Sequence, residues 1–193
     1  MHNIAVFASG NGTNFEAIAK AINEGRIHDA KIVLLVVDHG DVKVIDRARR
    51  LDIPYAIVLL KDYASKKEYE EHILALLQAK EVEWIFLAGY MKIVESTLLD
   101  AYPNHIVNIH PALLPAFKGA HAIQDSFNYG VKVFGVTIHY VSPELDGGKI
   151  IAQRAFDYVE GEDVDEVESR IHAIEHVLYP ETIEKLLHPE EKR

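Results

Sequence analysis

The stretch "IAVFASGNGTNFEAIAKAINEG", residues 4–25, joins an apolar run, a glycine turn and a helical pattern without interruption. The apolar run at 4–8 is typical of a short buried strand. Beyond the turn, apolar side chains recur at helical spacing, at Phe15, Ile18 and Ile22. Thr13 and Glu16 have the spacing of a capping box, which predicts that the helix begins at Thr13. A buried strand that leads directly into a helix is the repeating unit of α/β proteins.

The same alternation continues along the chain. Further buried strands are predicted at 31–37, 55–60, 84–88 and 105–109, with helices around 42–51, 66–79 and 95–101. A helix at 121–129, two strands at 131–141 and 148–159, and a last helix at 163–178 follow. Fully apolar strands need cover on both faces, and "SPELDGG" between the last two strands suggests a hairpin. We therefore expect one α/β domain over 1–193, with an open, mostly parallel, Rossmann-like sheet, helices on both faces and an antiparallel C-terminal extension. The tail at 187–193 is expected to be frayed.

Composition narrows the class of protein. The chain has 193 residues, no cysteine and a formal net charge of −10. Such an acidic chain lacks the basic face of a general nucleic-acid binder, so an anionic ligand would need local groups to hold it. No apolar window approaches the ~18 residues of a membrane-spanning helix, and the N-terminus has no signal-peptide pattern. These features predict a cytoplasmic protein that contacts neither nucleic acid nor a membrane.

The glycine turn suits an anion, because backbone amides at a helix N-terminus attract negative charge. A dinucleotide fingerprint, G-x-G-x-x-G, matches at Gly10 and Gly12 but fails at Phe15, where the third glycine would allow close helix packing. A Walker loop fails too, since no Gly-Lys-Ser/Thr follows. Two interpretations remain: a plain tight turn and, as we favour, a monophosphate site formed by Gly12, Thr13 and Asn14.

A second polar feature is "VNIHPALLP", which ends a predicted strand with an amide and an imidazole. Asn108 and His110 are two residues apart, so both point to the same side of an extended chain. Asn108 can donate to an oxygen that gains negative charge, and His110 can move a proton near neutral pH. The pair therefore suits acyl transfer without a covalent nucleophile, although a capping Asn beside a surface His is the simpler alternative. Pro111 and Pro115 favour function because they limit drift of the pair, whereas Asp146, alone, is an ordinary turn residue.

Five motifs carry a resemblance to a known family. They are "ASGNGTN", "LAGYMKIV", "NIHPALLPAFKG", "GVTIHYV" and "ELDGG". In this order and spacing the chain resembles the glycinamide ribonucleotide formyltransferases, which are folate-dependent enzymes of purine synthesis. The resemblance extends from Ile4 to about Leu187, and the long central motif is its most specific part.

The resemblance implies a role for each matching position. The catalytic centre would consist of Asn108, His110 and Asp146. The ribonucleotide site would consist of Gly12, Thr13, Asn14, His172 and Glu175. The folate site would consist of Lys66, Met91, Lys92, Ile93, Val94, Asn108, Ser142, Pro143, Glu144, Leu145 and Asp146, with Lys67 as an alternative to Lys66 for the folate tail. Lysine at 66 and 92, where the family more often has arginine, cannot bind a carboxylate bidentately, and His172 stands where a glutamine is familiar.

The implied reaction transfers formyl from 10-formyltetrahydrofolate to glycinamide ribonucleotide, giving formylglycinamide ribonucleotide and tetrahydrofolate in de novo purine biosynthesis. Asn108 and protonated His110 would stabilise the oxyanion, and Asp146 would aid a proton shuttle. The alternatives are a formyltetrahydrofolate hydrolase and a non-catalytic folate- or nucleotide-binding regulator. The expected partners are the two small molecules; a homodimer is left open. No catalytic metal is expected, because the histidines show no H-E-x-x-H or comparable ligand spacing.

Overall fold

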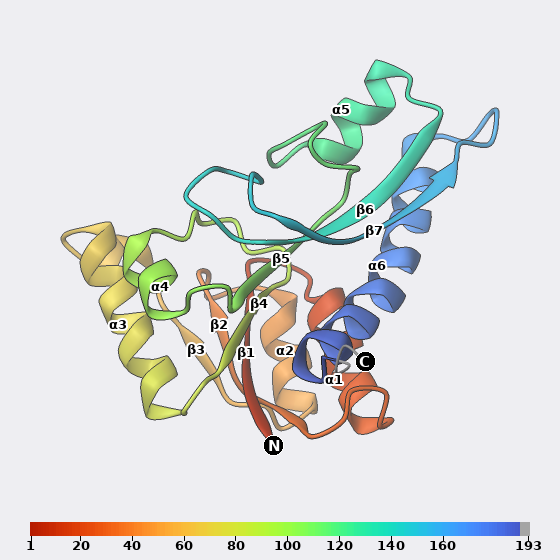
Figure 1. Ribbon diagram of the computed structural model, residues 1–193. Helices are drawn as coiled ribbons and strands as arrows, with labels where there is room; N and C mark the ends of the chain where they lie inside the picture. Colours follow the sequence, from red (N-terminus) through yellow and green to blue (C-terminus); the bar gives the residue numbers. More distant parts are fainter. Residues whose placement is uncertain (190–193) are drawn as a thin grey trace.

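The computed structural model describes residues 1–189 and places them around one seven-stranded sheet with the order β3-β2-β1-β4-β5-β6-β7 (Figure 1). The strands are β1 (His2–Ala8), β2 (Ala30–Val37), β3 (Tyr55–Ile57), β4 (Trp84–Leu87), β5 (Ile106–His110), β6 (Val133–Tyr140) and β7 (Ile150–Asp157). The helices are α1 (Thr13–Asn23), α2 (Lys43–Arg50), α3 (Lys66–Ala79), α4 (Ser96–Ala101), α5 (Ala122–Tyr129) and α6 (Val164–Leu187), with a 3₁₀ turn at Leu60–Asp62. Of the tail that was expected to be frayed, residues 190–193 lie outside the described part of the chain.

Strands β1 to β5 pair in parallel, whereas β6 is antiparallel to β5 and β7 is antiparallel to β6. The predicted fold class is therefore confirmed, including the antiparallel C-terminal extension. The direction changes beside β5, where Asn108 faces His139 in the register. Ligand sites of open α/β sheets lie outside the carboxyl ends of the strands, so this switch brings β6 to the same edge.

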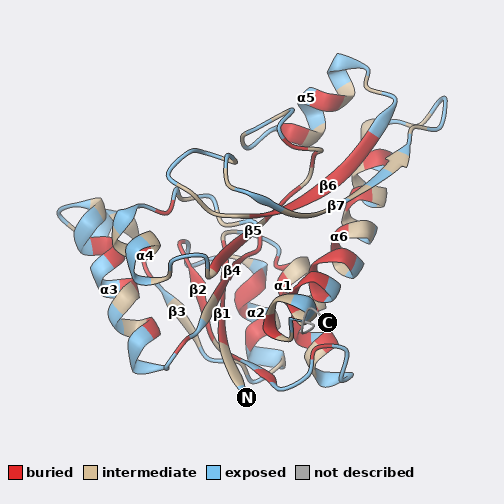
Figure 2. Ribbon diagram, in the orientation of Figure 1, coloured by how far each residue is buried: buried red, intermediate tan, exposed pale blue. Residues whose placement is uncertain are grey.

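Both faces of the sheet are covered, as the apolar strands require (Figure 2). Alternate residues of β1 enter opposite cores: Ile4 and Val6 pack with α1, α2 and α6, while Ala5 and Phe7 pack with α3 and α4. The long helix α6 also packs against β6 and β7. Its Tyr179 is fully buried and donates to the carbonyls of Leu87 at 2.8 Å and Val107 at 3.1 Å, which ties the helix to β4 and β5. Among the described helices, none is both long and apolar enough to cross a membrane.

The start of α1 corrects one prediction. The helix begins at Thr13, but its N-cap is Gly12 in the left-handed conformation and no side chain caps it. The capping box at Thr13 and Glu16 is therefore wrong. The carboxylate of Glu16 instead bonds to the guanidinium groups of Arg47 and Arg50 on α2, and this ion pair draws it away from the helix start.

Two element boundaries also differ from the prediction. The strand expected at 55–60 stops at Ile57, because β3 pairs only with β2 at the sheet edge and a 3₁₀ turn follows. Helix α6, expected to end at residue 178, continues to Leu187 through Pro180. Proline removes one backbone donor, but buried side chains on the following turns, including Ile183, continue the apolar stripe and hold the helix together.

Candidate active site

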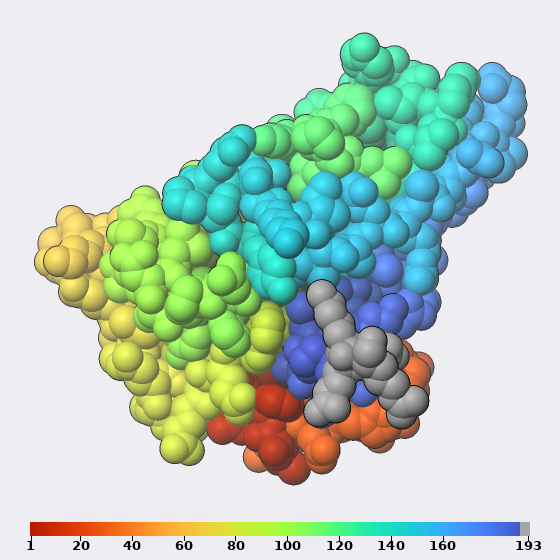
Figure 3. All heavy atoms as spheres, viewed as in Figure 1, coloured from red at the N-terminus to blue at the C-terminus, as the bar shows by residue number. Residues whose placement is uncertain are grey.

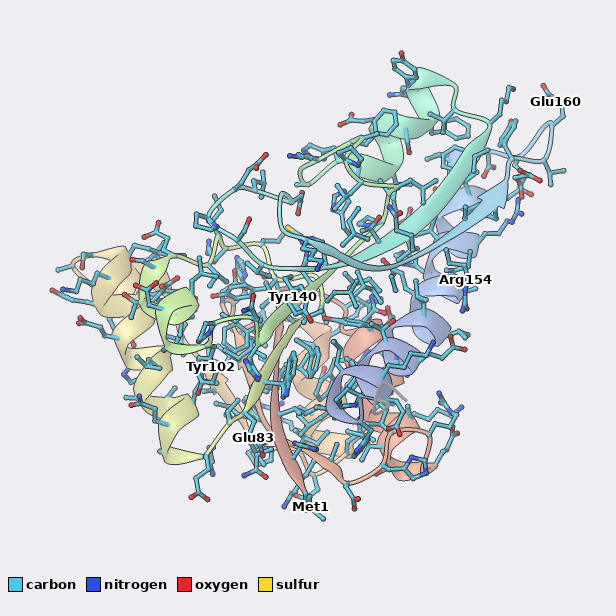
Figure 4. The ribbon with its side chains drawn as sticks, viewed as in Figure 1. Met1, Glu83, Tyr102, Tyr140, Arg154 and Glu160 are labelled. Carbon is cyan, nitrogen blue, oxygen red and sulfur yellow. The ribbon has the colours of Figure 1, made fainter. Side chains whose placement is uncertain are left out.

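A cavity of about 500 Å³ opens at the carboxyl ends of β1, β4 and β5, beside β6. Its walls include most of the residues predicted for the site, namely Gly12, Thr13, Asn14, Met91, Lys92, Ile93, Val94, Asn108, His110, Ser142, Glu144, Leu145, Asp146, His172 and Glu175. Tyr140, where β6 ends, lies near the centre of the molecule (Figure 4). From there β6, β7 and α5 extend as an arm beyond the body (Figure 3).

The three residues predicted to be catalytic meet on this cavity. Asn108 and His110 come from β5, and Asp146 comes from the loop between β6 and β7. The Oδ2 atom of Asp146 lies 3.6 Å from Nδ1 of His110. His110 is 4 % exposed, so the medium around this pair has a low dielectric and the interaction is little screened.

Asp146 is held by its own loop and by the segment that follows β5. Its backbone has a φ of 49°, in the left-handed region, and its Oδ2 accepts a bond from the amide of Gly119 at 2.8 Å. Gly148 closes the loop, since a Cβ there would lie 1.6 Å from the carbonyl oxygen of Tyr140. Only glycine fits at this point, so Gly148 allows the close approach of the two backbone segments in the loop that directs Asp146 into the cavity.

The imidazole of His110 has an acceptor at each nitrogen. Nε2 donates to the carbonyl of Phe117 at 2.8 Å, and Nδ1 faces the Asp146 carboxylate. An imidazolium can donate at both positions, whereas a neutral ring can donate at only one. The ring is therefore held between a backbone carbonyl and a carboxylate, with one acceptor at each nitrogen.

A fourth polar residue, His139, was not singled out from sequence. It is 2 % exposed, and its Nε2 lies 3.2 Å from Nδ2 of Asn108 and 3.8 Å from Oδ1 of Asp146. Burial lowers the pKa of His139, opposed by its bond to the carbonyl of Tyr140 and by the Asp146 charge. A neutral ring with its hydrogen on Nδ1 donates to Tyr140 and accepts from Asn108, so His139 orients the Asn108 amide. The detectable signal was one histidine in the apolar strand "GVTIHYV", opposite Asn108 in an antiparallel register.

The glycine turn offers unused donors to the other end of the cavity. Gly12 has a φ of 78°, which turns the chain into α1, and no side chain caps the helix. The first intrahelical bond runs from the amide of Glu16 to the carbonyl of Gly12 at 3.0 Å. The amides of residues 13–15, which precede Glu16, have no intrahelical acceptor. Gly12, Thr13 and Asn14 line the cavity, so this helix N-terminus can hold an anion.

A carboxylate lies close to this turn. Glu175 of α6 is 4 % exposed, and its Oε2 accepts from Asn14 Nδ2 at 3.2 Å and from His172 Nδ1 at 2.8 Å. The bond to Glu175 raises the pKa of His172, against the opposing effect of partial burial. Asn14 also keeps a buried Oδ1 with no protein partner. The cluster can therefore receive a ligand that carries hydrogen-bond donors.

The residues predicted to meet folate are divided. Met91, Ile93 and Leu145 line the cavity and are more than half exposed, which is unusual for large apolar side chains and suits a flat aromatic ligand. Lys92 also lines it, but its Nζ lies 3.9 Å from the buried Oδ2 of Asp38. Lys66 and Pro143 do not line the cavity. The Lys66 ammonium lies over the Tyr69 ring, 5.1 Å from its centre, and burial lowers its pKa.

Comparison with known proteins points to one activity. The family model described as formyl transferase matches residues 2–183. The chain is 48% identical over 187 residues to a phosphoribosylglycinamide formyltransferase of Bacillus subtilis, covering 97% of this chain and 95% of that protein. A protein of the same name from Haemophilus influenzae is 36% identical over 180 residues, covering 93% of this chain and 84% of its own.

Solved structures agree with these relatives. The phosphoribosylglycinamide formyltransferase of Bacillus halodurans superposes with a TM-score of 0.94 at 44% identity, covering 98% of this chain and 97% of that one. Glycinamide ribonucleotide transformylase 1 of Geobacillus kaustophilus gives a TM-score of 0.94 at 48% identity, covering 97% and 99%. Within residues 1–189, no group of three or more His, Cys, Asp or Glu side chains is arranged to hold a metal ion.

Proposed function

The chain belongs to the formyl transferase family, and we infer that it is the enzyme that formylates glycinamide ribonucleotide in purine biosynthesis. The formyl donor is 10-formyltetrahydrofolate, and no metal takes part. The observation that carries this inference is the cavity itself, which joins an uncapped helix N-terminus at one end to Asn108, His110 and Asp146 at the other.

Each end of the cavity has a matching substrate group. The phosphate of the ribonucleotide binds the turn at Gly12, Thr13 and Asn14, where neutral amides and the helix dipole supply attraction. Glu175 accepts hydrogen bonds from the glycinamide end. The folate ring stacks between the exposed apolar side chains of Met91, Ile93 and Leu145, which brings its formyl group towards Asn108. Holding both reactants in one cavity makes the transfer effectively intramolecular.

The transfer then needs no covalent enzyme intermediate. The amine nitrogen attacks the formyl carbon, and the carbonyl electron pair moves to oxygen. Asn108 donates to this oxyanion, and the positive charge of His110 stabilises it. The bond between the formyl carbon and the folate nitrogen breaks as the attacking amine loses its proton. Asp146 holds a water molecule that carries this proton from the amine to the leaving folate nitrogen. The products are formylglycinamide ribonucleotide and tetrahydrofolate.

A steady-state assay tests the function directly. Purified protein should consume 10-formyltetrahydrofolate rapidly with glycinamide ribonucleotide and not with methionyl-tRNA. Formate release in the absence of an acceptor should be slow. Rapid release without acceptor would identify a hydrolase, and binding of both ligands without turnover would identify a regulator.

A further inference from the structure

Arg47 of α2 lies behind the glycine turn and outside the cavity walls. Its Nε donates to the backbone carbonyl of Asn11 at 2.7 Å, and its Nη2 donates to the Asn11 side-chain oxygen at 2.9 Å. Its Nη1 bonds to Glu16 of α1. The side chain is 20 % exposed. One guanidinium therefore holds both Asn11, which lies between the two glycines, and Glu16, in the first turn of α1.

The rest of α2 supports the same turn. The amide of Val44 donates to the carbonyl of Gly10 at 3.1 Å. At Gly12 a Cβ would lie 2.3 Å from a methyl carbon of Val44, so the turn is packed tightly onto this helix. The backbone of the turn is consequently set by contacts from α2, with Arg47 supplying the side-chain hydrogen bonds and Val44 a backbone bond and the apolar contact.

Charge gives Arg47 a second effect. The turn itself contains only neutral residues, in a chain with a formal net charge of −10. Arg47 and Arg50 share the carboxylate of Glu16, but the Arg50 side chain is 65 % exposed and its charge is screened by solvent, so the less exposed Arg47 supplies the positive charge behind the turn. A phosphate at the turn would feel this charge through a poorly solvated part of the protein, where screening is weak.

We propose that Arg47 is the positioning residue of the phosphate-binding turn, and that its charge supplies attraction for the phosphate which the turn lacks. This inference rests on the proposed function for the identity of the phosphate ligand. Arg47 acts through Asn11 and does not touch the substrate. Removing Arg47 should weaken the binding of every ligand that carries the phosphate and should leave folate binding unaffected.

The test measures kcat and both KM values for Arg47→Ala and Arg47→Lys. Arg47→Ala should raise the KM for glycinamide ribonucleotide by about 10- to 100-fold, since a charged hydrogen bond contributes ~1.5–3 kcal/mol and 1.4 kcal/mol is tenfold. The KM for the folate should change by less than about threefold. Arg47→Lys keeps the charge but cannot make both bonds to Asn11. Its KM for glycinamide ribonucleotide should therefore lie between that of the unaltered protein and that of Arg47→Ala.

Arg50→Ala is the matched control. Arg50 is on the same helix and bonds to the same Glu16, but among the described residues it makes no hydrogen bond to Asn11. Its KM values should stay within about threefold of the unaltered protein. Glycinamide riboside, which lacks the phosphate, gives a second control: Arg47→Ala should leave its KM nearly unchanged. The proposal would be overturned if Arg47→Ala raised the KM for the ribonucleotide and for the riboside equally, or if it left the KM for the ribonucleotide unchanged.

A binding measurement separates this proposal from the proposed function. Titration with ribose 5-phosphate, followed through the amide signals of Gly12 to Asn14, needs no turnover. Arg47→Ala should weaken this binding by at least about tenfold, and Arg50→Ala should not. If the unaltered protein bound ribose 5-phosphate but formylated nothing, the proposed function would fail while Arg47 kept its role. If Arg47→Ala did not fold, Arg47→Lys would provide the decisive comparison. If Arg47→Lys bound ribose 5-phosphate as tightly as the unaltered protein and had the same KM for glycinamide ribonucleotide, the role of Arg47 would be refuted.

Discussion

The Asp146 carboxylate lies 3.6 Å from the ring of His110, and it is fixed there by a bond from the amide of Gly119. Because that amide uses one lone pair of Oδ2, the carboxylate cannot turn away without losing a backbone partner. The other oxygen faces His139 at 3.8 Å. One aspartate thus places its negative charge beside two buried imidazoles.

Asp146→Asn keeps the size of the side chain and removes its charge. A nearby carboxylate favours an imidazolium, so the pKa of His139, which Asp146 raises against the effect of burial, should fall further in the variant. Because the variant loses both the negative charge beside the two rings and the carboxylate that the proposed proton shuttle needs, kcat should drop by several orders of magnitude. NMR titration of the two rings separates the effect of the lost charge from that of lost proton shuttling. Unchanged titrations would leave Asp146 only a shuttling or loop-positioning role.

Asn108→Ala removes the amide that is proposed to donate to the oxyanion. Because that bond strengthens only as charge develops, kcat should fall by roughly 10²–10³ while both KM values change little. Steady-state kinetics with each substrate varied in turn measures the split. A kcat close to that of the unaltered protein would remove Asn108 from catalysis.

Gly12→Val places a branched side chain where the backbone has a φ of 78° and where Val44 already occupies the space. The turn must move, so binding of glycinamide ribonucleotide should be lost while folate analogues still bind. Calorimetric titration with each ligand measures both effects. Gly10→Ala is the control, since nothing lies within 4 Å of a Cβ at that glycine. Loss of both ligands in Gly12→Val would indicate a general folding defect.

His172 predicts a dependence of stability on pH. Its bond to Glu175 raises its pKa in the folded protein, so the protonated ring stabilises the fold. This contribution is complete below the unfolded pKa of about 6.5 and is lost as pH rises through the higher folded value. The side chain is 43% exposed, so the effect should stay below ~1 kcal/mol. Urea unfolding of His172→Gln at several pH values should show this dependence removed, and an identical profile would contradict the assignment.

Sequence patterns predicted β1, β2, β4 and β5 well, because these strands are continuous and largely buried apolar runs, whereas the edge strand β3 has no buried residue and is shorter than predicted. The three residues proposed to be catalytic lie together on the cavity. The spacing of Asn108 and His110 on one strand suggested that pair, whereas Asp146 came only from the family resemblance, because nothing local in "ELDGG" indicates that it reaches β5. The errors have physical causes that only the folded chain shows. Glu16 has capping-box spacing yet pairs with Arg47, and the last helix continues past Pro180 because its buried face continues. His139 was missed because its partner, Asn108, lies on another strand.

The bond between Asn14 and Glu175 joins positions 161 residues apart, and it has a consequence for synthesis on the ribosome. The glycine turn is translated well before the carboxylate beside it, which belongs to α6. The proposed ribonucleotide pocket therefore stays incomplete in a nascent chain until α6 has left the exit tunnel. Substrate in the cell can stabilise only the finished protein, because a ligand favours the state that binds it. Stalled or truncated chains lacking α6 should gain no such protection from proteolysis.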